Sequence, residues 1–470
     1  MAEGNRQDFH QETGETLNTQ RAAMRSLWGA LDLPHSSLDR LEFCGGDELP
    51  SAFRVSDLAA AAIGAAALAV SELVGTMGRA PRVHVDRRRS ALWFGWSIKP
   101  VGWDMPAAWD PIAGDYRTGD GWIRLHTNAP RHRAAALDVL GCKADRAAVA
   151  AAVETWAADA LEAAVVAGGG CAAAMRDLEA WSAHPQGRAV EAEPLIALDH
   201  WGVNGDWNWQ PQARRPLAGI KVLDLTRVLA GPVATRFLAG YGADVLRIDP
   251  PEWDEPGVIP EVTLGKRCAR LDLDRSADRA IFERLLSESH ILAHGYRPGA
   301  LDALGYGEAK RREIAPNLVD VSLDAYGWTG PWKERRGFDS LVQMSSGIAA
   351  RGMMWKRVDR PTPLPVQALD QATGYLMAAT AVRGLTSRLR TGQVSRGRGS
   401  LARTAAELVR MGPAATTPVW ENASGGDYAP SVEATDWGPA RRTKAPALVE
   451  NAPMQWERGA SRLRSVAPAW

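Results

Sequence analysis

Short apolar runs alternate with helix-length stretches between residues 217 and 330. In the helix-length stretches, apolar residues recur at the three- to four-residue period of one helix face. Alternation of strand and helix patterns at this spacing predicts a doubly wound parallel sheet. We therefore expect an α/β protein whose large, Rossmann-like domain lies in the second half of the chain. The apolar runs are "IKVLDL" (220–225), "ADVLRI" (243–248), "ARLDL" (269–273), "HILAH" (290–294) and "LVDVSL" (318–323).

The first half has a different pattern, rich in alanine and helical in period. The run "AAAAIGAAALAV" (59–70), flanked by Asp57 and Glu72, reads as a buried helix that is too short to span a bilayer. Glycine and aspartate turns around short Trp, Ile and Leu runs predict a hairpin within 110–128. We expect a smaller α+β domain here. The predicted divisions are an N-terminal extension (1–44), a first unit with the small domain (45–203), a linker (204–216), the Rossmann-like domain (217–411) and a wrapping tail (412–470).

A weak internal repeat links the two halves. Residues 55–79 and 368–392 each begin with an aspartate, continue through a helix of small residues and leave through arginine and glycine. Upstream of each, Asp47 and Asp359 lie about ten residues before the shared aspartate. These matched features favour duplication over chance similarity between alanine-rich helices.

Charge and cysteine usage exclude several classes of function. The formal net charge is +0, so the chain as a whole exerts no pull toward nucleic acid or an anionic membrane. The four cysteines are scattered without a C-x-x-C pair, as in reduced cytosolic proteins. His290 and His294 flank a buried apolar run, which disfavours metal binding. We expect a cytoplasmic protein with no metal site, no nucleic-acid partner and no membrane partner.

The turn after the first strand is the feature most suggestive of a ligand. It reads "TRVLAGP" (226–232), whereas a dinucleotide site needs Gly-x-Gly-x-x-Gly. Asp249 ends the second strand as a ribose-binding acid would. Without the glycine triplet, however, a NAD enzyme is disfavoured.

Five segments of the second half follow one another in an order and spacing that point to a known family. They are "PLAGIKVLDLTRVLAGPVATRFLAGYGADVLRIDPP" (216–251), "LGKRCARLDL" (264–273), "YRPGALDALGYG" (296–307), "NLVDVSLDAYGWTGPW" (317–332) and "RGFDSLVQMSSGIA" (336–349). Through these segments the second half resembles the class III coenzyme A transferases, also called the L-carnitine dehydratase/bile-acid-inducible protein family. The first half is similar to the later part of the same family, through "GDGWIRLHTN" (119–128) and "WSAHPQGRAV" (181–190). The chain thus looks like a truncated copy followed by a second copy that lacks its small domain.

The resemblance implies transfer of coenzyme A from an acyl-CoA thioester to a carboxylic acid. An aspartate carboxylate attacks the thioester to give a mixed anhydride, and an enzyme–CoA thioester follows. By its place between the "SSG" segment and the next helix, Asp359 is the implied nucleophile. Asp370 is expected to cap its helix, and Asp47 to be a relic of the duplication.

The racemase branch of the family serves as a test of a different activity. It places a histidine where this chain has Phe338, so one of the two acid/base groups of a 2-methylacyl-CoA racemase is missing. Racemase is therefore the less favoured alternative. The stronger alternative is a non-catalytic or partner-dependent CoA-binding subunit.

The resemblance also implies the CoA contacts and the assembly. The helix N-terminus after Pro232 would offer N–H groups to the diphosphate, and no cofactor is expected beyond coenzyme A or acyl-CoA as substrate. A homodimer, interlocked in the family, is implied, with the small domain supplied by the first half or by a second chain. The expected CoA-binding residues are Arg227, Leu229, Ala230, Lys266, Arg267, Tyr296 and Arg297.

Overall fold

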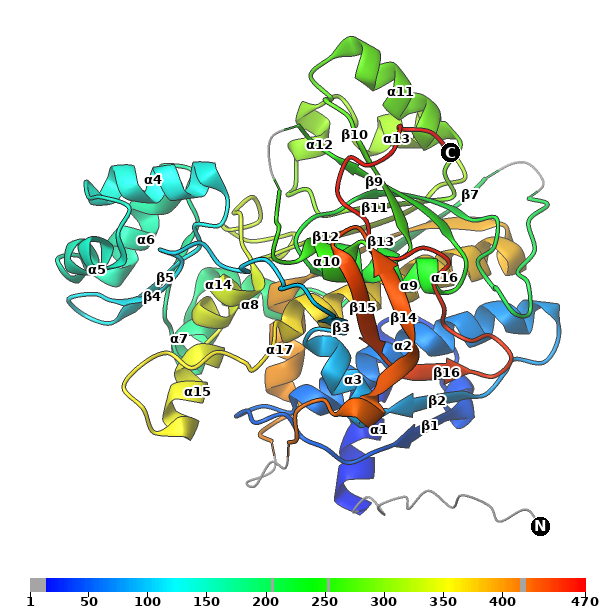
Figure 1. The fold of residues 1–470 in the computed structure, drawn as a ribbon, viewed down its shortest axis with the longest axis horizontal. Coiled ribbons are helices and arrows are strands. Elements are labelled where there is room, and N and C mark those ends of the chain that lie inside the picture. Colours follow the sequence, from blue (N-terminus) through cyan, green and yellow to red (C-terminus); the bar gives the residue numbers. More distant parts are fainter. Residues whose placement is uncertain (1–13, 204–206, 252–253, 415–419) are drawn as a thin grey trace.

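A seven-stranded sheet forms the centre of the computed structural model, which describes residues 14–203, 207–251, 254–414 and 420–470 (Figure 1). The strand order is β10-β9-β8-β11-β12-β13-β7. All neighbours run parallel except β7, which pairs antiparallel with β13. The strands are β7 (Ala197–Gly202), β8 (Lys221–Leu225), β9 (Asp244–Asp249), β10 (Lys266–Arg270), β11 (Ile291–His294), β12 (Val319–Asp324) and β13 (Gln393–Ser400).

The apolar runs of the second half form the strands of this sheet, as predicted. Parallel strands are covered on both faces, so their residues are buried almost continuously, as β12 shows along its length. One strand differs from its predicted position. β10 begins at Lys266, ahead of the run 269–273, because Lys266 is buried and pairs in register with Val245 of β9.

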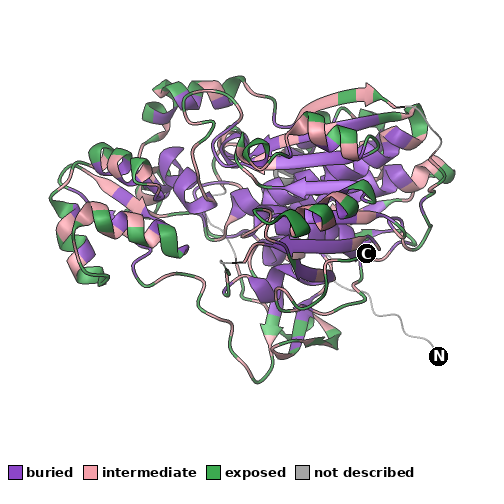
Figure 2. Ribbon diagram, turned by 90° about the horizontal axis from the view of Figure 1, so that it is seen from above, coloured by how far each residue is buried: buried purple, intermediate pink, exposed green. Residues whose placement is uncertain are grey.

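Helices cover both faces of the sheet, and the strands between them are mostly buried (Figure 2). The longest helix, α16, spans Ala368–Thr391 and packs against β12 and β13 on one side and α9 on another. The other helices of the second half are α9 (Ala230–Gly240), α10 (Ile259–Val262), α11 (Ser276–Ser287), α12 (Ala300–Ala303), α13 (Glu308–Ile314), α14 (Asp339–Ser345), α15 (Ile348–Lys356) and α17 (Leu401–Arg410).

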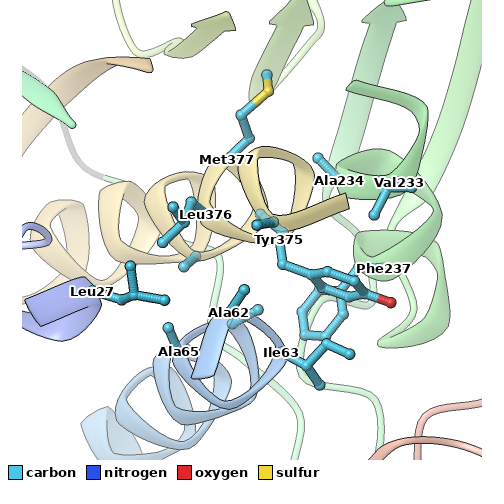
Figure 3. Packing of buried hydrophobic residues seen from close by; sticks show 14 of the residues in the cluster. Leu27, Ala62, Ile63, Ala65, Val233, Ala234, Phe237, Tyr375, Leu376 and Met377 are labelled. Carbon is cyan, nitrogen blue, oxygen red and sulfur yellow. The ribbon is translucent and has the colours of Figure 1, made fainter. Parts of the chain in front are cut away.

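The beginning of the chain packs onto the same core. α2 (Val55–Val74) lies along α16, the helix that matches it in the internal repeat. Figure 3 shows Ala62 and Ile63 of α2 facing Tyr375 and Leu376 of α16. The described part of the predicted N-terminal extension contains helix α1 (Gly14–Gly29), whose Leu27 is fully buried against this layer.

The remaining elements of the first segment join the body or lead to the small domain. They are η1 (His35–Arg40), β1 (Leu41–Cys44), η2 (Gly75–Met77), β2 (Val83–Asp86), α3 (Arg87–Phe94) and β3 (Ile98–Pro100). Residues 55–77 are the one stretch of the described chain with the length and apolarity of a membrane span, at mean hydropathy 1.9. In the structure, 89% of that stretch's most apolar window is buried inside the protein.

A small α+β domain projects from the body, at the left of Figure 1. It contains the predicted hairpin, in which β4 pairs antiparallel with β5, and β6 adds a third strand. The chain returns through α7 (Leu178–Ala183) and α8 (Pro185–Ala192) to β7 at the edge of the large sheet. The small domain comprises β4 (Gly114–Arg117), β5 (Trp122–Leu125), α4 (Pro130–Leu140), α5 (Arg146–Glu154), α6 (Ala158–Ala167) and β6 (Ala172–Ala174).

The tail adds strands to the first segment. β15 (Gly438–Thr443) pairs with β3, and β16 (Ala447–Val449) pairs with β2. β14 (Tyr428–Thr435), preceded by η3 (Gly425–Asp427), pairs with β15. Backbone hydrogen bonds therefore tie the tail to β2 and β3 of the first segment.

Candidate functional site

A cavity of about 360 Å³ opens where the order of the large sheet changes direction. From β8 the chain continues to β9 on one side of it and then to β10, whereas β11 lies on the opposite side of β8. Loops that follow parallel strands in opposite directions separate here, which leaves a crevice at the carboxyl ends of the strands. The lining residues from these strand ends are Leu225, Thr226, Arg227, Gly295, Tyr296, Arg297, Leu323, Asp324 and Ala325.

The first turn of α9 forms part of the cavity floor. α9 begins at Ala230, two residues before Pro232, so the free N–H groups come from Ala230 and Gly231 rather than from residues after the proline. Gly231 is required here, since a Cβ on it would lie 2.3 Å from the Cβ of Thr226. Ala230 and Gly231 both line the cavity.

Arginines dominate the polar lining of the cavity. Arg131 of α4 meets Arg227 and Arg297 from the strand ends and Arg336 from the loop before α14. Burial, and then the guanidinium groups of Arg336, Arg227 and Arg297, lower the pKa of Arg131. Within the described ranges, neither Arg131, Arg297 nor Arg336 has an acidic partner. A cluster of like charges of this kind is suited to a polyanion.

One carboxyl group, that of Asp370, faces this cavity from the first turn of α16. The helix begins after Gln367, so Asp370 is not the N-cap that the sequence predicted. Asp370 is only 7% exposed, and no group in the described part of the chain donates a hydrogen bond to its side chain. Burial, and then the charges of Asp339 and Glu255, raise its pKa well above the usual range.

A second carboxyl group, Asp324, lines the cavity at the end of β12. Its Oδ1 accepts a hydrogen bond from the backbone N–H of Gly327 at 2.8 Å, and its Oδ2 is buried without a partner among the described residues. Burial raises the pKa of Asp324 well above that of a free aspartate. A raised pKa favours the neutral form of this carboxyl group, in which it carries a donor O–H.

The small domain closes the cavity with His132, next to Arg131 on α4. His132 is 2% exposed and packs edge-on against Phe338, with ring centroids 5.9 Å apart and an interplanar angle of 67°. On the other side, His126 stacks on Phe338 with centroids 3.6 Å apart. Burial, and then Arg131 and Arg336, lower the pKa of His132 to about 4.

Two further cavities adjoin this one. A cavity of about 430 Å³ shares Arg131, Leu225, Arg227 and Tyr296 with it and extends past Leu271. A cavity of about 210 Å³ lies beyond Val228 and Phe338 and is lined by His126 and Glu255 among others. The 430 Å³ cavity continues the cationic lining through Arg131 and Arg227, whereas the 210 Å³ cavity is lined by the acidic residues Asp110, Asp254 and Glu255. Among the described residues, no three or more His, Cys, Asp and Glu side chains gather as a metal site would require.

Four of the residues expected to bind coenzyme A line the cavity: Arg227, Ala230, Tyr296 and Arg297. The other three do not. Leu229 precedes α9 and is buried in the core, at 4% exposure. Arg267 pairs with Asp244 at 2.8 Å and donates to the carbonyl of Ala469, on the outer edge of the sheet.

Lys266 is the clearest correction to the expected phosphate contacts. Its Nζ is fully buried, 3.0 Å from Asp224, and it also donates to the hydroxyl of Thr235 and the carbonyl of Pro232. Burial lowers its pKa to about 8. The alternation of side chains along β10 turns Lys266 into the core beneath α9, so it supports the floor of the cavity instead of contacting a ligand.

Asp359, the nucleophile implied by the resemblance, lies outside the cavity. It follows α15 in an exposed loop, its side chain is 80% exposed, and its partner is Arg117 of the small domain at 3.1 Å. The matching residue of the first copy, Asp47, pairs with Arg88, which also binds Asp427 at 2.9 Å.

The internal repeat places Asp57 where the second copy has Asp370. Asp57 is fully buried and accepts from the guanidinium of Arg87 at 2.9 Å. Arg87 also pairs with Glu48, so this carboxylate is neutralised inside the core. The copies thus differ in chemistry at one shared position: the aspartate of the first is ion-paired, and that of the second faces a cavity.

Sequence reasoning missed Asp370 and His132 as cavity residues. The repeat did single out Asp370, because it opens both matched helices. No local signal marks His132, since its place in the cavity depends on how the small domain meets the sheet.

Comparisons with known proteins find likenesses over part of the chain. Residues 217–439 match the model of CoA-transferase family III. The succinyl-CoA:glutarate CoA-transferase of Homo sapiens is 32% identical over 209 residues, which cover 41% of this chain and 47% of that protein. The probable fatty acyl-CoA transferase Rv3272 of Mycobacterium tuberculosis is 31% identical over 192 residues, covering 38% and 48%. The chain therefore spans about half the length of these curated relatives.

Solved structures match with partial coverage. A crystal structure of Rv3272 aligns with a TM-score of 0.38 at 27% identity, over 42% of this chain and 58% of that one. A CAIB/BAIF family protein from Brucella suis aligns with a TM-score of 0.37 at 25% identity, over 48% and 65%. The likeness to CoA-transferase family III rests on the sequence and covers residues 217–439 of this chain.

Proposed function

We propose that this chain is a CoA-transferase that moves coenzyme A from an acyl-CoA thioester to a carboxylic acid. The observation that carries the proposal is the meeting of Asp370 with the arginine cluster in one cavity. Coenzyme A is a polyanion joined to a thioester by a long arm. The cluster and the adjoining cavity would hold its phosphates, and Asp370 would meet the thioester carbon.

Asp370 takes the nucleophilic role in this proposal, in place of Asp359. A covalent catalyst has to approach the reacting carbon in a site shielded from water, because water would hydrolyse an anhydride. Asp370 is buried and lines the cavity, whereas Asp359 is exposed and paired with Arg117. In the matching helix, Asp57 is held by Arg87 and is unsuited to attack.

The reaction would proceed through covalent intermediates on Asp370. A carboxylate oxygen of Asp370 bonds to the acyl carbon, and the C–S bond breaks to release the CoA thiolate. The thiolate then attacks the Asp370 carbonyl carbon, which frees the donor acid and leaves Asp370 as a CoA thioester. A carboxylate oxygen of the acceptor acid then attacks the thioester carbon of Asp370 and releases the CoA thiolate. The thiolate attacks the acyl carbon of the acceptor, which forms the new acyl-CoA and frees the Asp370 carboxylate. These steps consume no metal, redox cofactor or nucleotide.

The named relatives suggest donors and acceptors for a first test. Their names include succinyl-CoA with glutarate and acetyl-CoA with oxalate. We propose a small acyl-CoA and a dicarboxylic acid as the starting panel. The homodimer implied by the resemblance remains part of the proposal.

A non-catalytic CoA-binding subunit is the second candidate. It is favoured by the buried environment of Asp370, which raises the pKa of the carboxyl group and so disfavours its ionised, nucleophilic form. The transferase requires that Asp370 be ionised when it attacks the thioester. Racemase chemistry stays less favoured, because Phe338 stands where that branch has its histidine.

A covalent trap separates these candidates. The purified chain is incubated with the acyl-CoA panel and with hydroxylamine, which cleaves acyl anhydrides and thioesters to hydroxamates. A hydroxamate on the peptide that carries Asp370, present in wild type and in Asp359→Asn but absent in Asp370→Asn, supports the transferase. CoA binding without any adduct in wild type supports the subunit, and an adduct that depends on Asp359 would overturn the assignment of Asp370.

A further inference from the structure

His132 is a buried histidine whose polar atoms are unused within the described structure. It lies in the first turn of α4, directly after Arg131, and is 2% exposed. Neither Nδ1 nor Nε2 has a hydrogen-bond partner among the described residues. An imidazole buried in this state costs free energy, since each nitrogen has given up its water without replacement.

The cavity lining explains where the missing partner would come from. His132, Phe338 and Asp370 all line the same 360 Å³ cavity, although they come from the small domain, the loop before α14 and the first turn of α16. The edge-on contact with Phe338 fixes one side of the imidazole. A substrate carbonyl that reaches Asp370 therefore enters a space that His132 also borders.

The attack on a thioester creates a specific demand in that space. When the Asp370 oxygen bonds to the acyl carbon, the C=O bond becomes a C–O⁻ bond, and the negative charge needs a hydrogen-bond donor. Arg131 and Arg336 belong to the cationic part of the cavity, where the phosphates of coenzyme A would compete for them.

We propose that His132 is a catalytic residue that donates a ring N–H to the thioester oxygen as the Asp370 anhydride forms and breaks down. This inference rests on the proposed transferase function and names a donor for its oxyanion. No proton is transferred in the step: the N–H hydrogen stays on the imidazole, the O–C bond to Asp370 forms and the C–S bond breaks. The small domain thereby supplies a reacting-centre group to the sheet that holds the nucleophile.

The protonation state of His132 suits this role. Its lowered pKa, about 4, leaves the ring neutral at pH 7, with one N–H donor and one acceptor nitrogen. A neutral imidazole N–H can stabilise an oxyanion without first losing an ion pair to a nearby carboxylate. The tautomer is free to adapt, since neither nitrogen is engaged by the described residues.

The test is a single-turnover measurement of adduct formation at Asp370. We compare wild type with His132→Leu, which removes the donor, and with His132→Gln, which keeps an amide N–H. His84→Gln is the matched control, because His84 is a partly exposed surface histidine that pairs with Glu42. Thermal melts of each variant exclude unfolding as the cause of a rate change.

The proposal expects a loss of rate with little loss of binding. Removal of one oxyanion donor lowers rates by roughly 100-fold to 1,000-fold in known enzymes, so His132→Leu should slow adduct formation by about 100-fold. His132→Gln should recover at least a tenth of the wild-type rate, and the Kd for acyl-CoA should change less than threefold. A structural role alone would not give this recovery.

A spectroscopic readout tests the contact itself. In the unreactive Asp370→Asn background, the ¹³C=O stretch of a bound labelled thioester should move to higher frequency when His132 is replaced by leucine. A wild-type rate in His132→Leu, or an unchanged stretch, overturns the role of His132 and leaves the transferase intact. Absence of any adduct in wild type overturns the proposed function, and the role of His132 falls with it.

Discussion

The carboxylate of Asp339 accepts a hydrogen bond from the backbone N–H of Asp370, with Oδ2 and N 2.8 Å apart. The contact ties the first turn of α16 to the first turn of α14. It also brings two acidic residues together in the core, where burial raises the pKa of Asp339 to about 6. The same charge is one of the reasons why the pKa of Asp370 is raised.

Removal of the Asp339 charge should shift the pH dependence of catalysis. Asp370 must be ionised to attack, so kcat/KM should rise with pH through its raised pKa. Asp339→Asn keeps an oxygen that accepts from the Asp370 N–H but removes the repelling charge. The acidic limb of the kcat/KM profile should therefore move to lower pH. Glu255→Gln should move the limb in the same direction by less, because Glu255 raises the pKa of Asp370 less than Asp339 does. A limb that stays in place in both variants would contradict the role of Asp370.

Buried histidines should make the protein sensitive to acid. Burial lowers the pKa of His126 to about 3, below the ordinary value of 6.5. Between these values the unfolded state binds more protons than the folded state, so the free energy of unfolding should fall as pH drops from about 6.5 toward 3. His126→Gln removes the titrating group, and urea titrations at pH 7 and pH 5 should show a smaller pH dependence in this variant. An equal loss of stability in both proteins would contradict the assignment.

Lys266 should behave as a structural residue. Lys266→Met leaves Asp224 buried without its ammonium partner, and removal of one member of a buried pair costs about 3–5 kcal/mol. The double variant Lys266→Met with Asp224→Asn should recover part of that free energy of unfolding, as measured by urea denaturation. If Lys266→Met folds with wild-type stability and instead weakens CoA binding, Lys266 contacts the ligand as the sequence suggested.

Gly374 sets the distance between α16 and α9. A Cβ at this position would lie 2.3 Å from the carbonyl oxygen of Ala230, a backbone atom that cannot move without displacing the first turn of α9. Overpacking of this kind costs about 1–3 kcal/mol, so Gly374→Ala should lower the free energy of unfolding by that amount. It should also weaken acyl-CoA binding, because Ala230 lines the cavity. Gly202→Ala is the control, since a Cβ there meets nothing within 4 Å.

The sequence predicted the sheet well because the strands are buried on both faces and read as apolar runs. It misplaced β10, whose first residue is a lysine that becomes buried through a partner, Asp224, on another strand. The residues of the cavity were likewise predicted in part. The resemblance named Arg227 and Tyr296, and both line the cavity because they follow strands at the carboxyl edge of the sheet.

The aspartates could not be sorted by sequence alone. Asp359 and Asp370 lie eleven positions apart, and both have a counterpart in the first copy. Which of them meets the cavity depends on the course of the loop after α15, which carries Asp359 out toward Arg117. The placement of His132 likewise depends on contacts between segments distant in the chain.

The most direct test of the central claim follows oxygen through the reaction. In the proposed cycle, the acceptor acid attacks the enzyme–CoA thioester, and one of its oxygens remains on the aspartate when the new acyl-CoA leaves. Turnover with an ¹⁸O-labelled acceptor acid should therefore place ¹⁸O in the carboxyl group of Asp370, as read by mass spectrometry of its peptide. Label on the peptide of Asp359, or turnover with no label on either, would contradict the account.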